Sequence, residues 1–82
     1  MNITFEELRR IKHSLPQGSI SRIANDLNKE EQDVRNFFGA SKFKGAAEDW
    51  HYEPGPGGGI VNIKDTTILD YAERILRESL QN

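Results

Sequence analysis

The fold is decided by residues 20–38, which read ISRIANDLNKEEQDVRNFF. The first part of this stretch has the i, i+3, i+4, i+7 spacing of an amphipathic helix, carried by Ile20, Ile23, Ala24 and Leu27. Asn28 then interrupts the pattern, and asparagine tolerates a left-handed backbone. In the second part, one side of the expected helix carries Val34, Phe37 and Phe38. The stretch therefore predicts two amphipathic helices joined by a tight turn.

The second of these helices, expected over about residues 29–40, has a polar outer face. Gln32, Arg35 and Asn36 fall opposite its apolar side. Its acidic residues gather at the N-terminus, where they suit the helix dipole. Asn28 followed by Glu31 is a capping pattern for this helix, and Ser19 or Ser21 could cap the helix before it. The exposed centre of the helix is therefore polar without being acidic.

A further helix is expected ahead of this unit. Thr4 and Glu7 form a capping box, apolar residues then recur at helical spacing, and Pro16 stops the pattern. Ile3 could pack on Leu8 as a hydrophobic staple. The polar face of this helix carries Arg9, Arg10, Lys12 and His13.

Two short runs rich in β-formers follow, DWHYE at residues 49–53 and IVNIK at residues 60–64. Between them lies the glycine-rich cluster Gly55–Gly59. A phosphate-binding loop would open a helix, but this cluster is followed by a strand and lacks the closing Lys-Ser/Thr. We therefore predict a hairpin over about residues 49–64, with the cluster turning the chain.

The last element is a strongly amphipathic helix over residues 66–81. Thr67 with Asp70 reads as another capping box. The apolar stripe is wide for a small domain, so this helix either closes the monomer or pairs with its copy in a two-fold homodimer. We expect the homodimer.

Residues 20–38 resemble the bacterial helix-turn-helix. Ala24 matches the small residue of the first helix in that family, and Asn28 stands at the turn position that is usually glycine. The apolar positions are matched by Ile23, Leu27, Val34 and Phe37. Lys29 departs from the pattern, since many members have a small apolar residue there. With the preceding helix, the hairpin and the last helix, the chain is similar to winged helix-turn-helix proteins over nearly its whole length, and to small uncharacterised bacterial proteins labelled DNA-binding.

The resemblance implies an α+β fold in one domain, residues 1–82, with three N-terminal helices, a two-stranded hairpin wing and a C-terminal helix. It also implies a transcriptional regulator that reads duplex DNA with the third helix in the major groove. Gln32 and Asn36 suit adenine, and Arg35 suits guanine or a phosphate. Contacts to the DNA backbone would come from Ser21, Arg22, Asn25, Lys42 and Lys44.

Composition limits the other possibilities. The net charge is −2, with +2 over residues 1–44 and −4 over residues 45–82, which suits a protein partner better than a duplex. A winged-helix protein-interaction module without DNA binding therefore stays open as the alternative. The chain has no cysteine, its two histidines lack ligand spacing, and no nucleophile motif is present, so we expect neither a metal, nor a cofactor, nor an enzyme. An N-terminus without an apolar run predicts a cytoplasmic protein.

Overall fold

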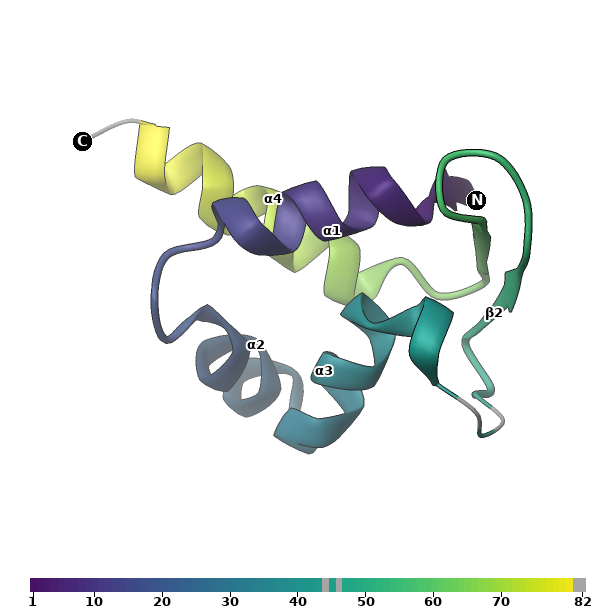
Figure 1. The fold of residues 1–82 in the computed structure, drawn as a ribbon. Helices are drawn as coiled ribbons and strands as arrows, with labels where there is room; N and C mark the ends of the chain where they lie inside the picture. Colours follow the sequence, from purple (N-terminus) through teal and green to yellow (C-terminus); the bar gives the residue numbers. More distant parts are fainter. Residues whose placement is uncertain (44, 46, 81–82) are drawn as a thin grey trace.

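The computed structural model describes residues 1–43, 45 and 47–80. This part of the chain forms four α-helices, one 3₁₀ turn and three strands (Figure 1). In chain order they are β1 (Asn2–Thr4), α1 (Phe5–Ser14), α2 (Ser19–Leu27), α3 (Glu31–Phe38), η1 (Ala40–Lys42), β2 (Trp50–Glu53), β3 (Ile60–Ile63) and α4 (Thr67–Leu80). The α+β class is as predicted. The third helix is shorter than the expected residues 29–40, because the chain tightens into η1 after Gly39.

The sheet differs from the predicted two-stranded hairpin. It has three antiparallel strands in the order β1-β3-β2. The register pairs Ile3 with Val61, and Trp50 with Ile63, so β3 is the central strand. The extra strand β1 is only three residues long, and its strand form comes from pairing with β3 rather than from its own sequence pattern.

The start of α1 follows the sequence prediction, and the starts of α2 and α3 do not. Thr4 caps α1, since its Oγ1 accepts the Glu7 N–H at 3.2 Å. The cap of α2 is Gly18 with a left-handed backbone (φ 86°), not Ser19 or Ser21. The Ser19 hydroxyl instead donates to the Pro16 carbonyl. The N-cap of α3 is Glu30 without a side-chain hydrogen bond, so the predicted Asn28–Glu31 cap is wrong.

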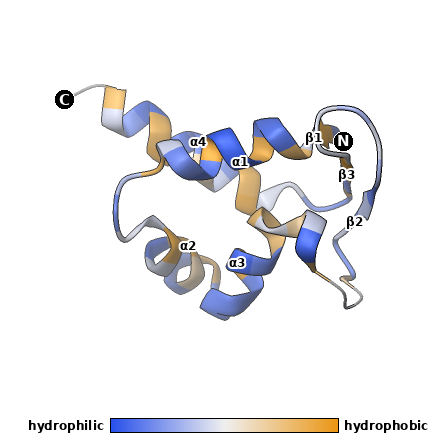
Figure 2. Cartoon of the chain, viewed as in Figure 1, coloured by the Kyte–Doolittle hydropathy of each residue, from blue (hydrophilic) through white to orange (hydrophobic). Residues whose placement is uncertain are grey.

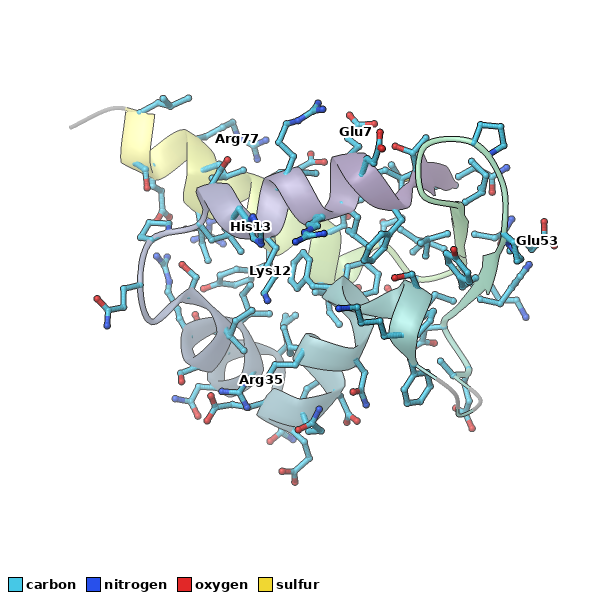
Figure 3. All side chains as sticks on the ribbon, viewed as in Figure 1. Glu7, Lys12, His13, Arg35, Glu53 and Arg77 are labelled. Atoms are coloured by element: carbon cyan, nitrogen blue, oxygen red, sulfur yellow. The ribbon has the colours of Figure 1, made fainter. Side chains whose placement is uncertain are left out.

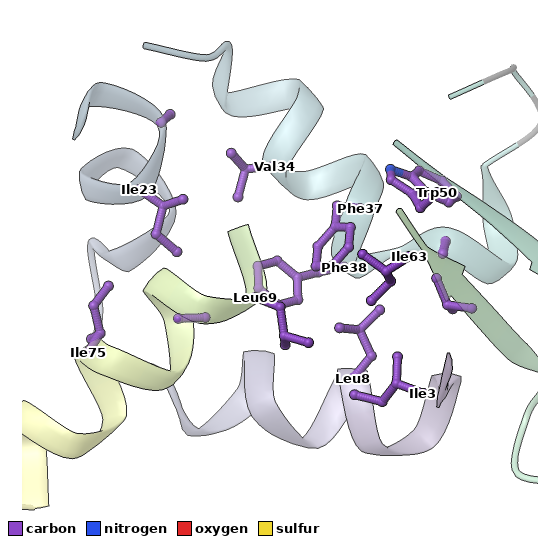
Figure 4. Close-up of a cluster of buried hydrophobic side chains, with 14 residues drawn as sticks. Ile3, Leu8, Ile23, Val34, Phe37, Phe38, Trp50, Ile63, Leu69 and Ile75 are labelled. Atoms are coloured by element: carbon purple, nitrogen blue, oxygen red, sulfur yellow. The ribbon is translucent and has the colours of Figure 1, made fainter. Parts of the chain in front are cut away.

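The buried core joins every helix to the sheet. Figure 4 shows Leu8 of α1, Phe38 of α3 and Leu69 of α4 meeting near its centre. The predicted core positions Val34, Phe37, Phe38 and Trp50 are all buried. Figure 2 shows hydrophobic and hydrophilic segments alternating along the helices, as amphipathic helices require. The sequence periodicity therefore identified the faces correctly.

The last helix, α4, packs against α1 and α2. Its start is stabilised by Asp65, whose Oδ1 accepts the Thr67 N–H at 3.0 Å and also the Thr67 hydroxyl. The predicted Thr67–Asp70 capping box is therefore wrong, and Thr66 donates to Asp70 instead. These hydrogen bonds from Thr67 lower the pKa of Asp65. None of the helices in the described part of the chain has the length and apolar character needed to cross a membrane.

An aromatic and ionic cluster fixes α4 to α2. The guanidinium groups of Arg22 and Arg74 both lie over the Tyr71 ring, at 5.6 and 5.4 Å from its centroid. The Tyr71 hydroxyl donates to Asp26 of α2, and Glu78 pairs with Arg22 at 3.0 Å. Cation–π contacts and ion pairs at an exposed site are individually weak, so the cluster stabilises the contact between the two helices only modestly.

Candidate nucleic-acid interface

The turn between α2 and α3 has a defined geometry. Asn28 adopts φ 54° and ψ 47°, the left-handed conformation that the sequence predicts. The Lys29 N–H donates to the Ala24 carbonyl at 2.8 Å, and the Asn28 N–H donates to the Asn25 carbonyl at 3.2 Å. This pair of hydrogen bonds is a Schellman motif, which ends a helix and redirects the chain. Ala24 is 3% exposed, so its small side chain lets α3 cross α2 closely.

The outer ridge of α3 carries the predicted base-reading amides. Gln32 is exposed and Asn36 is half-buried. The Gln32 amide nitrogen donates to the Asn36 Oδ1 at 2.9 Å, across one helical turn. Two coupled amides on one exposed ridge offer adjacent donors and acceptors to whatever docks there.

Arg35 and Ser21 converge on one carboxylate at the flank of this ridge. The Arg35 guanidinium pairs with Glu31 at 3.2 Å, and the Ser21 hydroxyl donates to the same Glu31 oxygen at 2.8 Å. The side chains of Arg35 and Glu31 are 54% and 46% exposed, so water weakens their attraction. Glu31 therefore holds α2 to α3 and orients Arg35, but it also neutralises the charge that a phosphate would need.

The other predicted backbone contacts are spread over several surfaces. Arg22 faces α4 and pairs with Glu78, and its hydrogen bonds to Tyr71 and Glu78 raise its pKa. Asn25 is exposed one turn after Ser21, on the same side of α2. Lys42 is exposed at the end of η1, and Lys44 lies outside the described residues. The structure thus brings two of these residues, Ser21 and Asn25, to one exposed side of α2, and Ser21 is hydrogen-bonded to Glu31 of α3. Arg22 instead points toward α4.

A basic residue that the prediction left out lines the same groove as Arg35. Lys12 of α1 and Arg35 line one groove of about 320 Å³, together with Ser21 and the left-handed Gly18. In Figure 3, Lys12 extends from α1 toward the α2–α3 pair. The sequence showed Lys12 on the polar face of α1, but its position next to α3 depends on the packing of two helices.

The tip of the hairpin packs back on the molecule. The Phe5 and Glu6 N–H groups at the start of α1 donate to the carbonyls of Gly59 (2.9 Å) and Gly57 (3.0 Å). The Tyr52 hydroxyl donates to the Gly58 carbonyl at 2.7 Å. Glycine carbonyls thus satisfy N–H groups that a helix start leaves unpaired. The cluster turns the chain, as predicted, and anchors α1.

No group of three or more His, Asp or Glu side chains among residues 1–43, 45 and 47–80 is placed to hold a metal ion. Comparison of the chain with protein-family models, with curated proteins and with solved structures gave no match. The function must therefore be inferred from the geometry of the chain itself.

Proposed function

We propose that this chain is a winged helix-turn-helix protein that binds duplex DNA, with α3 in the major groove and a role in transcription regulation. One observation carries the proposal. The Schellman turn at Asn28 and the buried Ala24 hold α3 across α2 so that Gln32 and Arg35 are exposed and Asn36 is half-buried beside them. This exposure supports the proposal, because a recognition helix reads base edges with the side chains of its outer face.

The amides have suitable chemistry for adenine. A Gln or Asn side chain can bond adenine N6 and N7 together, and each such contact discriminates by about 1–3 kcal/mol. Gln32 and Asn36 already bond each other at 2.9 Å, so their orientation is partly set before DNA arrives. Pre-orientation lowers the entropic cost of binding.

Arg35 must leave Glu31 to reach a base. An exposed ion pair contributes about 0.2–1 kcal/mol, whereas a bidentate contact from arginine to guanine contributes about 1–3 kcal/mol. The exchange is therefore favourable. Glu31 acts as an internal competitor, so the specific contact replaces an intramolecular one rather than adding to it.

The proposed interface has few cations. Lys12, Arg35 and Lys42 are the described cations assigned to it, and both Glu31 and the net charge of −2 oppose a duplex. Two or three phosphate contacts give a slope of log K against log salt of about −2 to −3, shallower than the values of proteins with about six to ten contacts. A homodimer would double the contacts. Leu80 near the end of α4 is 86% exposed, which favours pairing through that helix.

The test is binding of labelled duplex DNA with mixed sequence at about 50 mM salt, followed by a salt series. Arg35→Ala is expected to weaken binding by several-fold to about 100-fold, the value of a single base contact less that of the Glu31 ion pair given up. Arg77→Ala is the matched control, because Arg77 is exposed on α4 and lies away from α3 (Figure 3). Glu31→Gln is expected to strengthen binding, since it releases Arg35 and removes a negative charge.

Absence of binding even at low salt, or equal weakening in Arg35→Ala and Arg77→Ala, would refute the proposal. Amide-shift mapping with the same duplex locates the surface, and shifts confined to α4 would favour the alternative of a protein-interaction module. Sedimentation tests the homodimer separately. A monomer mass at high protein concentration contradicts pairing through α4.

A further inference from the structure

A second groove lies on the flank of α3 opposite to Lys12 and Arg35. Asp33 and Phe37 face it, whereas Glu31 and Arg35 face the first groove. The volume is about 320 Å³, within the range of sites that hold a few side chains of a ligand. Its walls come from α3, the segment before β2, the start of β2 and the beginning of α4.

The floor of this groove is apolar and mostly aromatic. Trp50 is one of its lining residues, and the Phe43 and Phe37 rings lie 5.3 and 6.3 Å from the Trp50 ring, centroid to centroid. These three rings and Ile68 all line the groove: Phe37 and Trp50 are buried in the core beneath it, and Phe43 and Ile68 are half-buried and offer more of their surface. A floor fixed by core residues presents a rigid apolar surface to an incoming side chain.

The rim of the groove is acidic. Four carboxylates line it, from Asp33, Glu48, Asp49 and Asp65. Among the described lining residues there is one cation, Lys29. Asp33, Glu48 and Asp49 form no ion pair with another described residue. Asp65 uses one oxygen to hold the start of α4. Several carboxylates are therefore available around an apolar floor.

We propose that this groove binds a short basic segment of a protein partner, with an apolar side chain on Trp50 and Phe43 and flanking lysines or arginines at the rim. Charge complementarity decides the class of partner. A phosphate backbone is repelled by four carboxylates, whereas each basic side chain of a peptide gains an ion pair. The apolar contact supplies affinity, and the carboxylates make the groove prefer basic peptides over neutral or acidic ones.

The probe is a capped synthetic peptide, Lys-Arg-Leu-Leu-Lys-Arg, titrated into the protein. Trp50 is the only tryptophan in the chain and lines the groove, so its fluorescence reports occupancy directly. A saturable change is expected, together with amide shifts centred on the groove. The binding should weaken as salt is added, because the rim is exposed to solvent.

The test variant is Asp33→Asn with Glu48→Gln, which keeps side-chain shape and removes two rim charges. Removing each carboxylate charge should weaken peptide binding by about 1.5- to 5-fold, because each would form an exposed ion pair with the peptide. Glu7→Gln with Glu53→Gln is the matched control, since it makes the same charge change on exposed residues that do not line the groove (Figure 3). This control should bind as the unchanged protein does.

Three outcomes would overturn the proposal. One is no fluorescence or amide-shift response to the basic peptide. Another is equal binding of Glu-Glu-Leu-Leu-Glu-Glu or Gln-Gln-Leu-Leu-Gln-Gln, which would show that the rim selects nothing. The last is equal weakening in the control variant. Asn36, a proposed base contact, also lines this groove, but DNA binding is tested through Arg35, which lines the other groove, so either proposal can fail without the other.

Discussion

Replacing Gly59 with alanine tests whether the hairpin loop is fixed against the rest of the molecule. Gly59 has φ +107°, a region that residues with a Cβ rarely adopt. A Cβ added there would also overlap the ring and hydroxyl of Tyr52. Gly59→Ala therefore both strains the backbone and forces Tyr52 to move.

The expected magnitude follows from these two effects. The backbone strain costs about 1–3 kcal/mol. Displacing Tyr52 breaks its hydrogen bond to the Gly58 carbonyl (2.7 Å), at about 0.5–1.5 kcal/mol. It also disturbs the edge-on contact with Phe5 (6.4 Å between centroids), at about 0.5–1.5 kcal/mol. The total is about 2–6 kcal/mol, against a stability of about 4–12 kcal/mol for a chain of this length.

The assay is urea unfolding followed by circular dichroism. Gly18→Ala is the first control, since Gly18 has φ +86° but open space around it, so only a backbone cost of about 1–2 kcal/mol is expected. In Gly55→Ala the added Cβ also meets open space, without a positive φ, and the change should stay within about 0.5 kcal/mol. In a Tyr52→Ala background, Gly59→Ala should cost less than in the unchanged protein. A cost for Gly59→Ala no larger than that for Gly18→Ala would refute the steric overlap with Tyr52.

Two further predictions concern the start of α4 and the turn before α3. Hydrogen bonds from Thr67 lower the pKa of Asp65 in the folded state below its ordinary value of 3.8. The ionised Asp65 therefore stabilises the folded protein fully when the pH is above 3.8. This contribution is lost as the pH falls from 3.8 through the lower folded-state pKa. The difference in unfolding free energy between the unchanged protein and Asp65→Asn should therefore shrink between pH values of about 6 and about 2.5, and a constant difference would contradict this. At Asn28, with φ 54°, alanine should cost about 1 kcal/mol, or about 4–8 °C in Tm, while glycine should be neutral or slightly stabilising. Equal melting temperatures for Asn28→Ala and Asn28→Gly would show that the left-handed turn carries no strain.

Local periodicity was enough to predict the helices and their buried faces. The spacing of Ile23, Ala24 and Val34 identified the sides of α2 and α3 that meet, and Asn28 marked the left-handed turn between them. These features depend on neighbours within about one or two turns, so a single segment contains the signal.

Features that depend on distant parts of the chain were missed. Residues 2–4 form β1 only because β3 is beside them, and their own sequence read as a helix start. The N-terminus of α1 is completed by the carbonyls of Gly57 and Gly59, which are distant in sequence, and no capping pattern indicates such a partner. Asp65 replaced the predicted Thr67–Asp70 cap because two adjacent patterns competed at the same helix start.

The candidate surfaces divide in the same way. The Gln32–Asn36 and Glu31–Arg35 pairs are one helical turn apart, so their contacts follow from spacing alone. The groove that Lys12 and Arg35 share requires the packing of α1 against α3. The acidic groove draws on four separate segments, so charge counting detected an acidic C-terminal half but not the surface it forms.

The central position of β3 has a consequence for synthesis of the chain on the ribosome. Ile3 pairs with Val61, so the sheet cannot close until residue 61 has been translated. At about 5–20 residues per second, β1 waits on the order of three to ten seconds for its partner. During that interval the apolar faces of α1, α2 and α3 lack the sheet and α4 that cover them. The apolar faces of the first three helices are therefore covered only after residues 60–80, which form β3 and α4, have been made.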